Sequence, residues 1–402
     1  MTLEEIRNGI GASVKEESTS PVKIAIIGVG GGGSNAVDNM IAAGVRVNTF
    51  MAINTDRQAL RVSKAQKRIQ IGSNLTKGFG AGADAEVGRK AAEESRDTLN
   101  NLIKDMDLVF ITAGMGGGTG TGAAPVIAEL AHNLGKLTVA FVTTPFAFEG
   151  EVRMRNAQIG IANLRKFVDS IIIIPNERLA SVAKDMTTQK AFEYADDVLR
   201  QGVQATTDLI ANPGRVNVDF ADICTILRGG GDTIMGIGCA SGTNRAMVAV
   251  QKAVNNAVLG TSIEGASRVI INVEGREIKM DEVSRAVEVV RGVCAKGANI
   301  IFGTAIVPEL QDSIQVTIIA TGFNTRPAAQ YAEEHPQAQP APQPIFPPQP
   351  TTMQQPAPQP VPQPQPQSTA TVQRTQSDNG RISLDDSESI SWWQKLNKKH
   401  RK

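Results

Sequence analysis

The chain has 402 residues, of which 41% are hydrophobic and 20% charged, enough for two globular domains that each bury a core. Its 41 basic and 40 acidic residues nearly balance, which argues against nucleic acid as the main partner. No apolar run approaches the roughly 20 residues that a bilayer requires. The acidic leader over 1–21 lacks the apolar core of a secretory signal, so we expect a cytoplasmic protein.

The cysteines stand far from one another and from the three histidines. They form neither a CxxC pair nor a zinc-ligand spacing, so no protein metal site is predicted. Small apolar packing residues are the simplest interpretation of Cys224, Cys239 and Cys294.

The first half of the chain alternates apolar strands with helical segments. Strands are predicted at 22–30, 46–56, 107–114, 137–145 and 170–176, with helices at 35–44 and 123–135. This alternation predicts an α/β fold with a mainly parallel sheet and helices on both faces. The nucleotide-binding domain is expected to span 22–187.

A long amphipathic stretch over 188–212 predicts a core helix that connects this domain to a second one. Beyond it, strands are predicted at 223–228, 268–275, 300–307 and 314–322, and helices at 243–260 and 281–297. The second, smaller α/β domain is therefore expected over 213–322.

Most of the 20 prolines fall between Pro327 and Pro366, in a segment with few branched or aromatic residues. Such a segment buries too little apolar surface to offset its ordering entropy, so 323–380 is predicted to be a disordered Pro/Gln-rich linker. The final stretch, 381–402, regains Trp392 and Trp393 beside basic residues. It is predicted to bind a partner, or to lie weakly on an anionic membrane.

Two glycine-rich loops carry the chemistry. Gly28, Gly30 and Gly33 match GxGxxG after the first strand, a pattern that lets backbone N–H groups approach a phosphate. Taken alone it also suits an NAD-dependent Rossmann dehydrogenase, with Asp56 as the ribose-binding acid, or a tight turn without ligand. The second loop, Gly114–Gly122, again lies between a strand and a helix. Two loops on one sheet favour a ligand with several phosphates, cradled by backbone amides and by the hydroxyls of Thr119 and Thr121.

The segments GVGGGGSNAV, NTD, GMGGGTGTGAAP, PFAFEG and NVDFAD occur in this order between Val22 and Gly322. Through them the chain resembles the FtsZ family of bacterial tubulin-like cell-division proteins. The resemblance implies a GTPase with a nucleotide-binding domain, a core helix and a second domain. It also implies head-to-tail polymerisation into filaments, a contractile ring at the mid-cell division site, and division-machinery proteins as partners of the tail.

The resemblance also implies roles for individual residues. Glu149 and Arg153 would contact ribose and phosphate, and Phe192 would stack on guanine. Asp196 would accept hydrogen bonds from N1 and N2 of guanine, a donor pair that adenine lacks; from the sequence alone a solvated helix face is the competing interpretation. The residues expected to hold the phosphates are Gly31, Gly32, Gly33, Ser34, Asn35, Gly117, Gly118, Thr119 and Gly120.

The segment NVDFAD follows the Pro213-Gly214 break. In the family the corresponding loop enters the nucleotide pocket of the neighbouring subunit, so Asp219 and Asp222 would polarise the attacking water in trans, with Asn217 helping to orient it. The alternatives are that these acids only cap the following element, and that the polymer does not hydrolyse its nucleotide.

Mg²⁺ is expected to accompany GTP and to keep several waters, with Asp56 as an indirect ligand. Whether a monovalent cation takes part is left open. The tail lacks the Pro-x-Phe-Leu-Arg run by which many relatives dock membrane-anchoring partners. Contact with a membrane is therefore expected to be indirect or weak.

Overall fold

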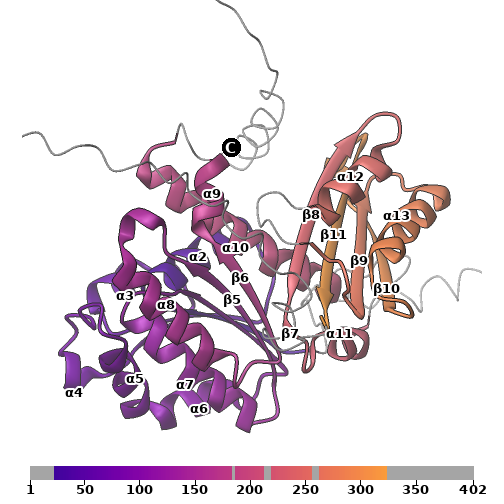
Figure 1. Ribbon diagram of the computed structural model, residues 1–402. Coiled ribbons are helices and arrows are strands. Elements are labelled where there is room, and N and C mark those ends of the chain that lie inside the picture. The colour runs from indigo at the N-terminus through magenta and orange to yellow at the C-terminus, as the bar shows by residue number, and fades with distance from the viewer. Residues whose placement is uncertain (1–21, 183–185, 212–218, 256–261, 324–402) are drawn as a thin grey trace, which may run out of the picture. The chain divides into compact units, whose positions relative to one another are not determined.

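The computed structural model describes residues 22–182, 186–211, 219–255 and 262–323 (Figure 1). The predicted leader and tail, all of the predicted linker except Phe323, and Asn217 lie outside this part of the chain. No helix among the described residues is long and apolar enough to cross a membrane.

The first sheet has seven parallel strands in the order β3-β2-β1-β4-β5-β6-β7. Near-continuous runs of Ile, Val and Ala form its centre, as expected for a parallel sheet that is covered on both faces. Its strands are β1 (Ile24–Val29), β2 (Thr49–Asn54), β3 (Lys67–Gln70), β4 (Leu108–Gly114), β5 (Leu137–Thr144), β6 (Ser170–Pro175) and β7 (Gly231–Asp232). The parallel arrangement predicted from the sequence is confirmed.

Helices cover both faces of this sheet (Figure 1). One face carries α2 (Gly30–Ala42), α3 (Arg57–Val62), α9 (Asn176–Val182), α10 (Thr188–Ala211) and α11 (Phe220–Leu227). The other carries α5 (Ala85–Glu94), α6 (Arg96–Ile103), α7 (Thr119–Asn133) and α8 (Glu151–Leu164). Two short elements, α4 (Ser73–Thr76) and the 3-10 turn η1 (Ala147–Glu149), complete this region.

Two of these helices touch through their backbones. A Cβ added at Gly122 of α7 would lie 1.9 Å from the carbonyl oxygen of Ala85, and one added at Gly88 of α5 would lie 2.3 Å from that of Gly118. No side chain separates α5 from the first turns of α7 at these points. The second glycine loop is therefore held directly against α5.

The second sheet has four strands in the order β10-β9-β11-β8. β9 (Arg268–Gly275) and β10 (Asn299–Ile306) are parallel, whereas β11 (Ser313–Thr321) runs antiparallel to both β9 and β8 (Ile234–Ser241). One face packs on α12 (Arg245–Val254) and α13 (Met280–Val293). The other shares a core with α10 and α11, and the short turn η2 (Pro308–Leu310) precedes β11. The predicted second, smaller domain is confirmed, with a mixed sheet.

One predicted strand is wrong, and three strands were not predicted: the short β3 and β7, and the longer β8. Residues 223–227 belong to a helix, α11, whose buried Ile223, Ile226 and Leu227 recur at helical spacing, and Arg228 caps its end. A short apolar run of this length does not distinguish the two structures. β8 escapes prediction because Gly236 and Gly238 lower its strand propensity. Each glycine lies directly beneath the backbone of α12.

Candidate functional site

The candidate site lies where the order in which strands are added to the first sheet reverses. From β1 the chain builds outward through β2 and β3, and from β4 it builds the other way, so β1 and β4 are neighbours at the switch point. Ligands bind at the carboxyl ends of such strands. Both glycine-rich loops start there, because α2 follows β1 directly and only four residues separate the end of β4 from the start of α7. The sites of dinucleotide-binding enzymes share this strand order, so the sheet alone does not identify the ligand.

The two loops touch each other. Gly30 has φ +73°, and a Cβ added there would lie 2.8 Å from the backbone nitrogen of Gly120. Gly33 is equally constrained, since a Cβ would lie 2.3 Å from the carbonyl oxygen of Thr112. These glycines are required by the packing of the chain itself.

Other glycines of the same loops are not required by packing. A Cβ added at Gly31 or Gly117 would have no heavy atom within 4 Å. Gly31, Gly32 and Asn35 are exposed, whereas Gly118 and Gly120 are buried. Open space above glycine backbone at two helix N-termini is what a phosphate chain needs for close approach to N–H groups.

Hydroxyl groups of the loops divide between two tasks. Thr121 accepts a 2.9 Å hydrogen bond from the backbone N–H of Gly116, so its hydroxyl braces the loop. Thr119, the first residue of α7, bonds the hydroxyl of Thr55 at 2.7 Å. Ser34 is 4% exposed, and its hydroxyl has no hydrogen-bond partner among the described residues. A buried hydroxyl without a partner in a glycine loop fits a site that a ligand completes.

Glu149 and Arg153 form an ion pair across η1 and the first turn of α8. Glu149 also accepts a 2.9 Å hydrogen bond from the backbone N–H of Phe146, and its side chain is nearly buried. The Arg153 guanidinium is half-exposed. Glu149 thus fixes Arg153, which leaves part of a cation available to an anionic ligand.

Three phenylalanines form a cluster beside this pair. Phe146 and Phe148 stack with ring centroids 5.1 Å apart, and Phe192 of α10 meets Phe146 edge-on at 5.2 Å. Phe148 is 66% exposed and Phe192 is 39% exposed, so aromatic surface is open to solvent. Phe192 was predicted to stack on the base. Phe148 was not, although its place in PFAFEG was a usable signal.

Asp196 lies one turn further along α10 and is half-buried. Burial, helped by the nearby carboxylates of Glu193 and Asp197, raises the pKa of Asp196 to about 7. Asp197 is engaged by Arg200 at 2.6 Å, whereas Asp196 has no hydrogen-bond partner among the residues that the structure describes. A desolvated carboxylate without a partner suits a ligand that brings its own donors. Partial burial and the raised pKa favour this role over that of a solvated helix face.

Asn176 was not predicted. It is the first residue of α9, directly after β6, and is 5% exposed. Its Oδ1 has no hydrogen-bond partner within the described part of the chain. A buried amide oxygen at the ligand edge of a parallel sheet is a further candidate for base recognition.

The predicted catalytic acids lie at the start of α11. Asp222 Oδ2 accepts a 3.3 Å hydrogen bond from the backbone N–H of Asp219, and Asp219 itself is exposed. Asp222 therefore helps to cap α11, as the competing interpretation required. Capping uses one carboxylate oxygen, so it does not exclude a second role for this acid.

Asp56 caps α3: its Oδ1 accepts hydrogen bonds from the backbone N–H groups of Gln58 at 2.7 Å and Ala59 at 3.3 Å. This capping uses one carboxylate oxygen, so by itself it does not exclude the ribose contact that the dehydrogenase interpretation needs. Within the described ranges, no group of three acidic, histidine or cysteine side chains is placed to hold a metal ion.

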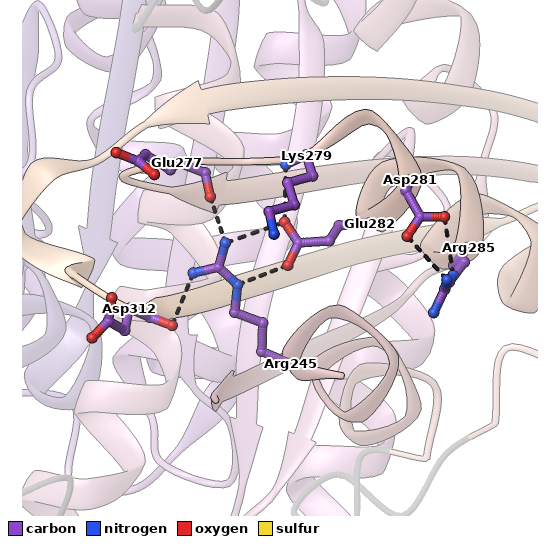
Figure 2. Close-up of polar contacts among 7 residues, drawn as sticks. All are labelled: Arg245, Glu277, Lys279, Asp281, Glu282, Arg285 and Asp312. Carbon is purple, nitrogen blue, oxygen red and sulfur yellow. Dashed lines mark hydrogen bonds and ion pairs between the residues drawn. The ribbon is translucent and has the colours of Figure 1, made fainter. Parts of the chain in front are cut away.

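A second polar cluster lies at the edge of the other sheet (Figure 2). Arg245 donates to both carboxylate oxygens of Glu282 at 2.8 and 3.2 Å, and to the carbonyl oxygens of Asp312 and Glu277 at 2.9 and 2.6 Å. Both side chains of the ion pair are less than a fifth exposed. Because its donors are used within the protein, Arg245 acts as a clamp between loops and not as a ligand site.

Comparison with protein families assigns both halves of the described chain. Residues 23–184 match the model described as "Tubulin/FtsZ family, GTPase domain". Residues 231–324 match "FtsZ family, C-terminal domain". The fold and the two-loop site are thus those of a GTP-binding protein of the tubulin/FtsZ class of GTPases.

Solved structures narrow this assignment. The FtsZ dimer of M. jannaschii is 38% identical, with a TM-score of 0.73, over 81% of this chain and 94% of that one. A tryptophan-to-tyrosine mutant of FtsZ from the same organism is 41% identical, with a TM-score of 0.72, over 76% and 92%. CetZ1 from Haloferax volcanii, at 24% identity and a TM-score of 0.66 over 78% and 98%, shares the fold. The chain belongs to the FtsZ family.

Proposed function

We propose that this GTPase polymerises head to tail and that each bound GTP is hydrolysed only when Asp219 and Asp222 of the next subunit reach it. One observation carries this proposal: the guanine-binding positions and the acids lie toward opposite ends of α10. Asp196 is near the beginning of α10, whereas Asp219 follows its end at Ala211. At 1.5 Å per residue, the helix alone places about 22 Å between Asp196 and Ala211.

The residues around the switch point supply the binding half of the reaction. Backbone N–H groups of Gly31, Gly32, Gly33, Gly117, Gly118 and Gly120, with Ser34, Asn35 and Thr119, hold the phosphates. Glu149 and Arg153 hold the ribose and phosphate end. Asp196 and Asn176 read the edge of guanine, and Phe192 and Phe148 cover its face.

Mg²⁺ fits this site only through the nucleotide. The described residues offer no acidic cluster, and one oxygen of Asp56 already caps α3. The ion would therefore be held by phosphate oxygens and waters, with the second oxygen of Asp56 reaching it through water. When bound, it neutralises charge on the β- and γ-phosphate oxygens. The acids of the neighbouring subunit then orient the attacking water, with Asn217 assisting.

Membership of the FtsZ family supports the wider role. The related M. jannaschii FtsZ is described as a dimer, which agrees with self-association. We propose that the filaments form a ring at the mid-cell division site and that the tail over 381–402 docks division proteins. The domain limits predicted from the sequence, 22–187, 188–212 and 213–322, are our proposal for the division into binding, connecting and activating parts.

Phosphate release per subunit, measured with GTP and with ATP as control across a series of protein concentrations, tests this function. A GTP-selective rate that rises above a threshold concentration is expected. A rate per subunit that is flat with concentration would mean that the active site is complete in one chain.

Mixing two inactive variants tests the trans mechanism more sharply. Asp222→Asn retains a capping side chain but lacks the carboxylate, and Asp196→Ala lacks the base contact but keeps the acids. At a mixed junction, wild-type acids meet a subunit that binds GTP normally, so mixing should restore hydrolysis. No restoration, with both variants incorporated into filaments, would contradict hydrolysis in trans. Unchanged phosphate release by Asp222→Asn alone would favour an inert acid.

A further inference from the structure

Thr55, at the end of the strand that precedes Asp56, has no role in the site as described so far. It is fully buried, with 0% exposure. Its hydroxyl lies 2.7 Å from the hydroxyl of Thr119. Among the described residues this is the only hydrogen bond that the Thr55 side chain makes. Its carbonyl oxygen is also engaged, by the Thr76 hydroxyl at 3.4 Å.

Burial favours one direction for this hydrogen bond. A hydroxyl has one proton to donate and two lone pairs that accept. A buried donor left unused costs more than an unused lone pair, because under-satisfied acceptors are better tolerated. Either hydroxyl could donate in this pair. Thr55 is 0% exposed and reaches no other partner among the described residues, whereas Thr119 is 8% exposed at the loops and can turn its proton toward a ligand, so we assign Thr55 as the donor.

The consequence for Thr119 is that its own proton is free. Thr119 begins α7, and a Cβ added at Gly30 of the first loop would lie 3.4 Å from its Cβ, so it stands where the two loops meet. A hydroxyl whose lone pair is occupied by Thr55 presents its proton to the remaining side. That side suits an anion, as do the helix N-termini around it.

We propose that Thr55 is a positioning residue that fixes the Thr119 hydroxyl as a donor to the nucleotide phosphates. The proposal rests on the proposed function, because it takes Thr119 to be a phosphate contact. It adds to the binding site a buried residue that contacts Thr119 and not the ligand. It also gives the buried Thr of NTD a purpose beyond packing, since valine would fill the same volume.

The test is a comparison of affinities for GTP, GDP and guanosine, measured by competition against a fluorescent GTP analogue. Thr55→Val keeps the shape and removes the hydroxyl, and Thr55→Ser keeps the hydroxyl. Thr206→Val is the matched control, because Thr206 is also buried but its hydroxyl bonds the Gly202 carbonyl oxygen at 3.0 Å within α10. Melting temperatures accompany each variant, so that loss of fold is separated from loss of affinity.

Thr55→Val should lower the affinity for GTP by about tenfold, the effect expected from losing a hydrogen bond to a charged group. The affinity for guanosine should stay unchanged. Thr55→Ser and Thr206→Val should bind like wild type. In Thr119→Ala, a further Thr55→Val change should add no loss, because the two residues act as one unit. Equal losses of affinity for GTP and guanosine in Thr55→Val would overturn the proposed positioning of Thr119 by Thr55, the relay. Additive losses in the double variant would overturn it as well.

Two failures remain distinguishable. If wild type binds GTP and Thr119→Ala weakens it, while Thr55→Val does not, the relay alone is wrong. If Thr119→Ala binds GTP as tightly as wild type, the assignment of Thr119 to the phosphates is wrong, and the relay is overturned with it.

Discussion

Glu274 is a buried acid that the proposed reaction does not use, and replacing it with glutamine should change the pH dependence of stability. It lies on β9 with 8% exposure. Asn272 Nδ2 donates to Oε1 at 2.7 Å, and Gln315 Nε2 donates to Oε2 at 3.0 Å. Burial, and then the carboxylate of Asp208 on α10, raise the pKa of Glu274 to about 7 in spite of these donors.

The sign follows from proton binding. Between pH 4.5 and 7 the folded chain keeps the Glu274 proton that the unfolded chain has released, so stability falls as pH rises through this window. The difference between an ordinary pKa of 4.5 and about 7 corresponds to roughly 3 kcal/mol in the free energy of unfolding. Glu274→Gln keeps the size of the side chain and removes the titrating group. Its NH2 needs the amide of Asn272 or Gln315 to turn its oxygen inward, so the clear expectation is that this part of the pH dependence disappears.

Urea unfolding at a series of pH values from 5 to 8 measures the effect. Asp196 shares the window and the sign, because its pKa is also raised to about 7. As pH rises, the wild type should therefore lose stability through both acids. Glu274→Gln should lose stability through Asp196 alone, and the double variant Glu274→Gln/Asp196→Asn should lose none through these two positions. A Glu274→Gln variant with the same slope as wild type would refute the reasoning from burial.

Three further outcomes are expected. Asp196→Asn should lose affinity for GTP and gain affinity for xanthosine triphosphate, in which a carbonyl replaces the guanine amino group. The affinity of the wild type for GTP should fall below pH 7, because Asp196 becomes protonated there. Binding titrations measure both. Gly31→Ala should weaken GTP binding at unchanged melting temperature, whereas Gly33→Ala should lower the melting temperature. Arg245→Ala should cost about 3 kcal/mol in urea unfolding, against under about 0.5 kcal/mol for the exposed Arg285→Ala.

The alternation of strands and helices was predictable because apolar runs and glycine stops are local signals. β1, β4, β5 and β6 therefore lie where the sequence placed them. α2 begins earlier than predicted, at Gly30, because the helix starts inside the glycine loop. Propensity disfavours glycine in a helix, but close packing against the second loop requires it there. Local reasoning fails where a neighbour decides the conformation.

The site shows the same division. The glycine loops carried their own signal, and Phe148 lay in the PFAFEG segment, whereas Asn176 depends on burial that arises only in the folded chain. Asp196 was found through resemblance; its desolvation, which suits it to guanine, is not written in the helical pattern. The position of Asn217 lies outside the described residues, so its predicted role stays a prediction.

The backbone contact between α5 and α7 limits how this sequence can change. A Cβ at Gly122 would lie 1.9 Å from the carbonyl oxygen of Ala85, and a Cβ at Gly88 would lie 2.3 Å from that of Gly118. Neither glycine can therefore be replaced unless the helices separate. Separation would shift the first turns of α7 and with them the second loop. Any chain that keeps both this helix pair and this loop must therefore keep glycine at these two positions. The outer faces of the same helices can vary freely.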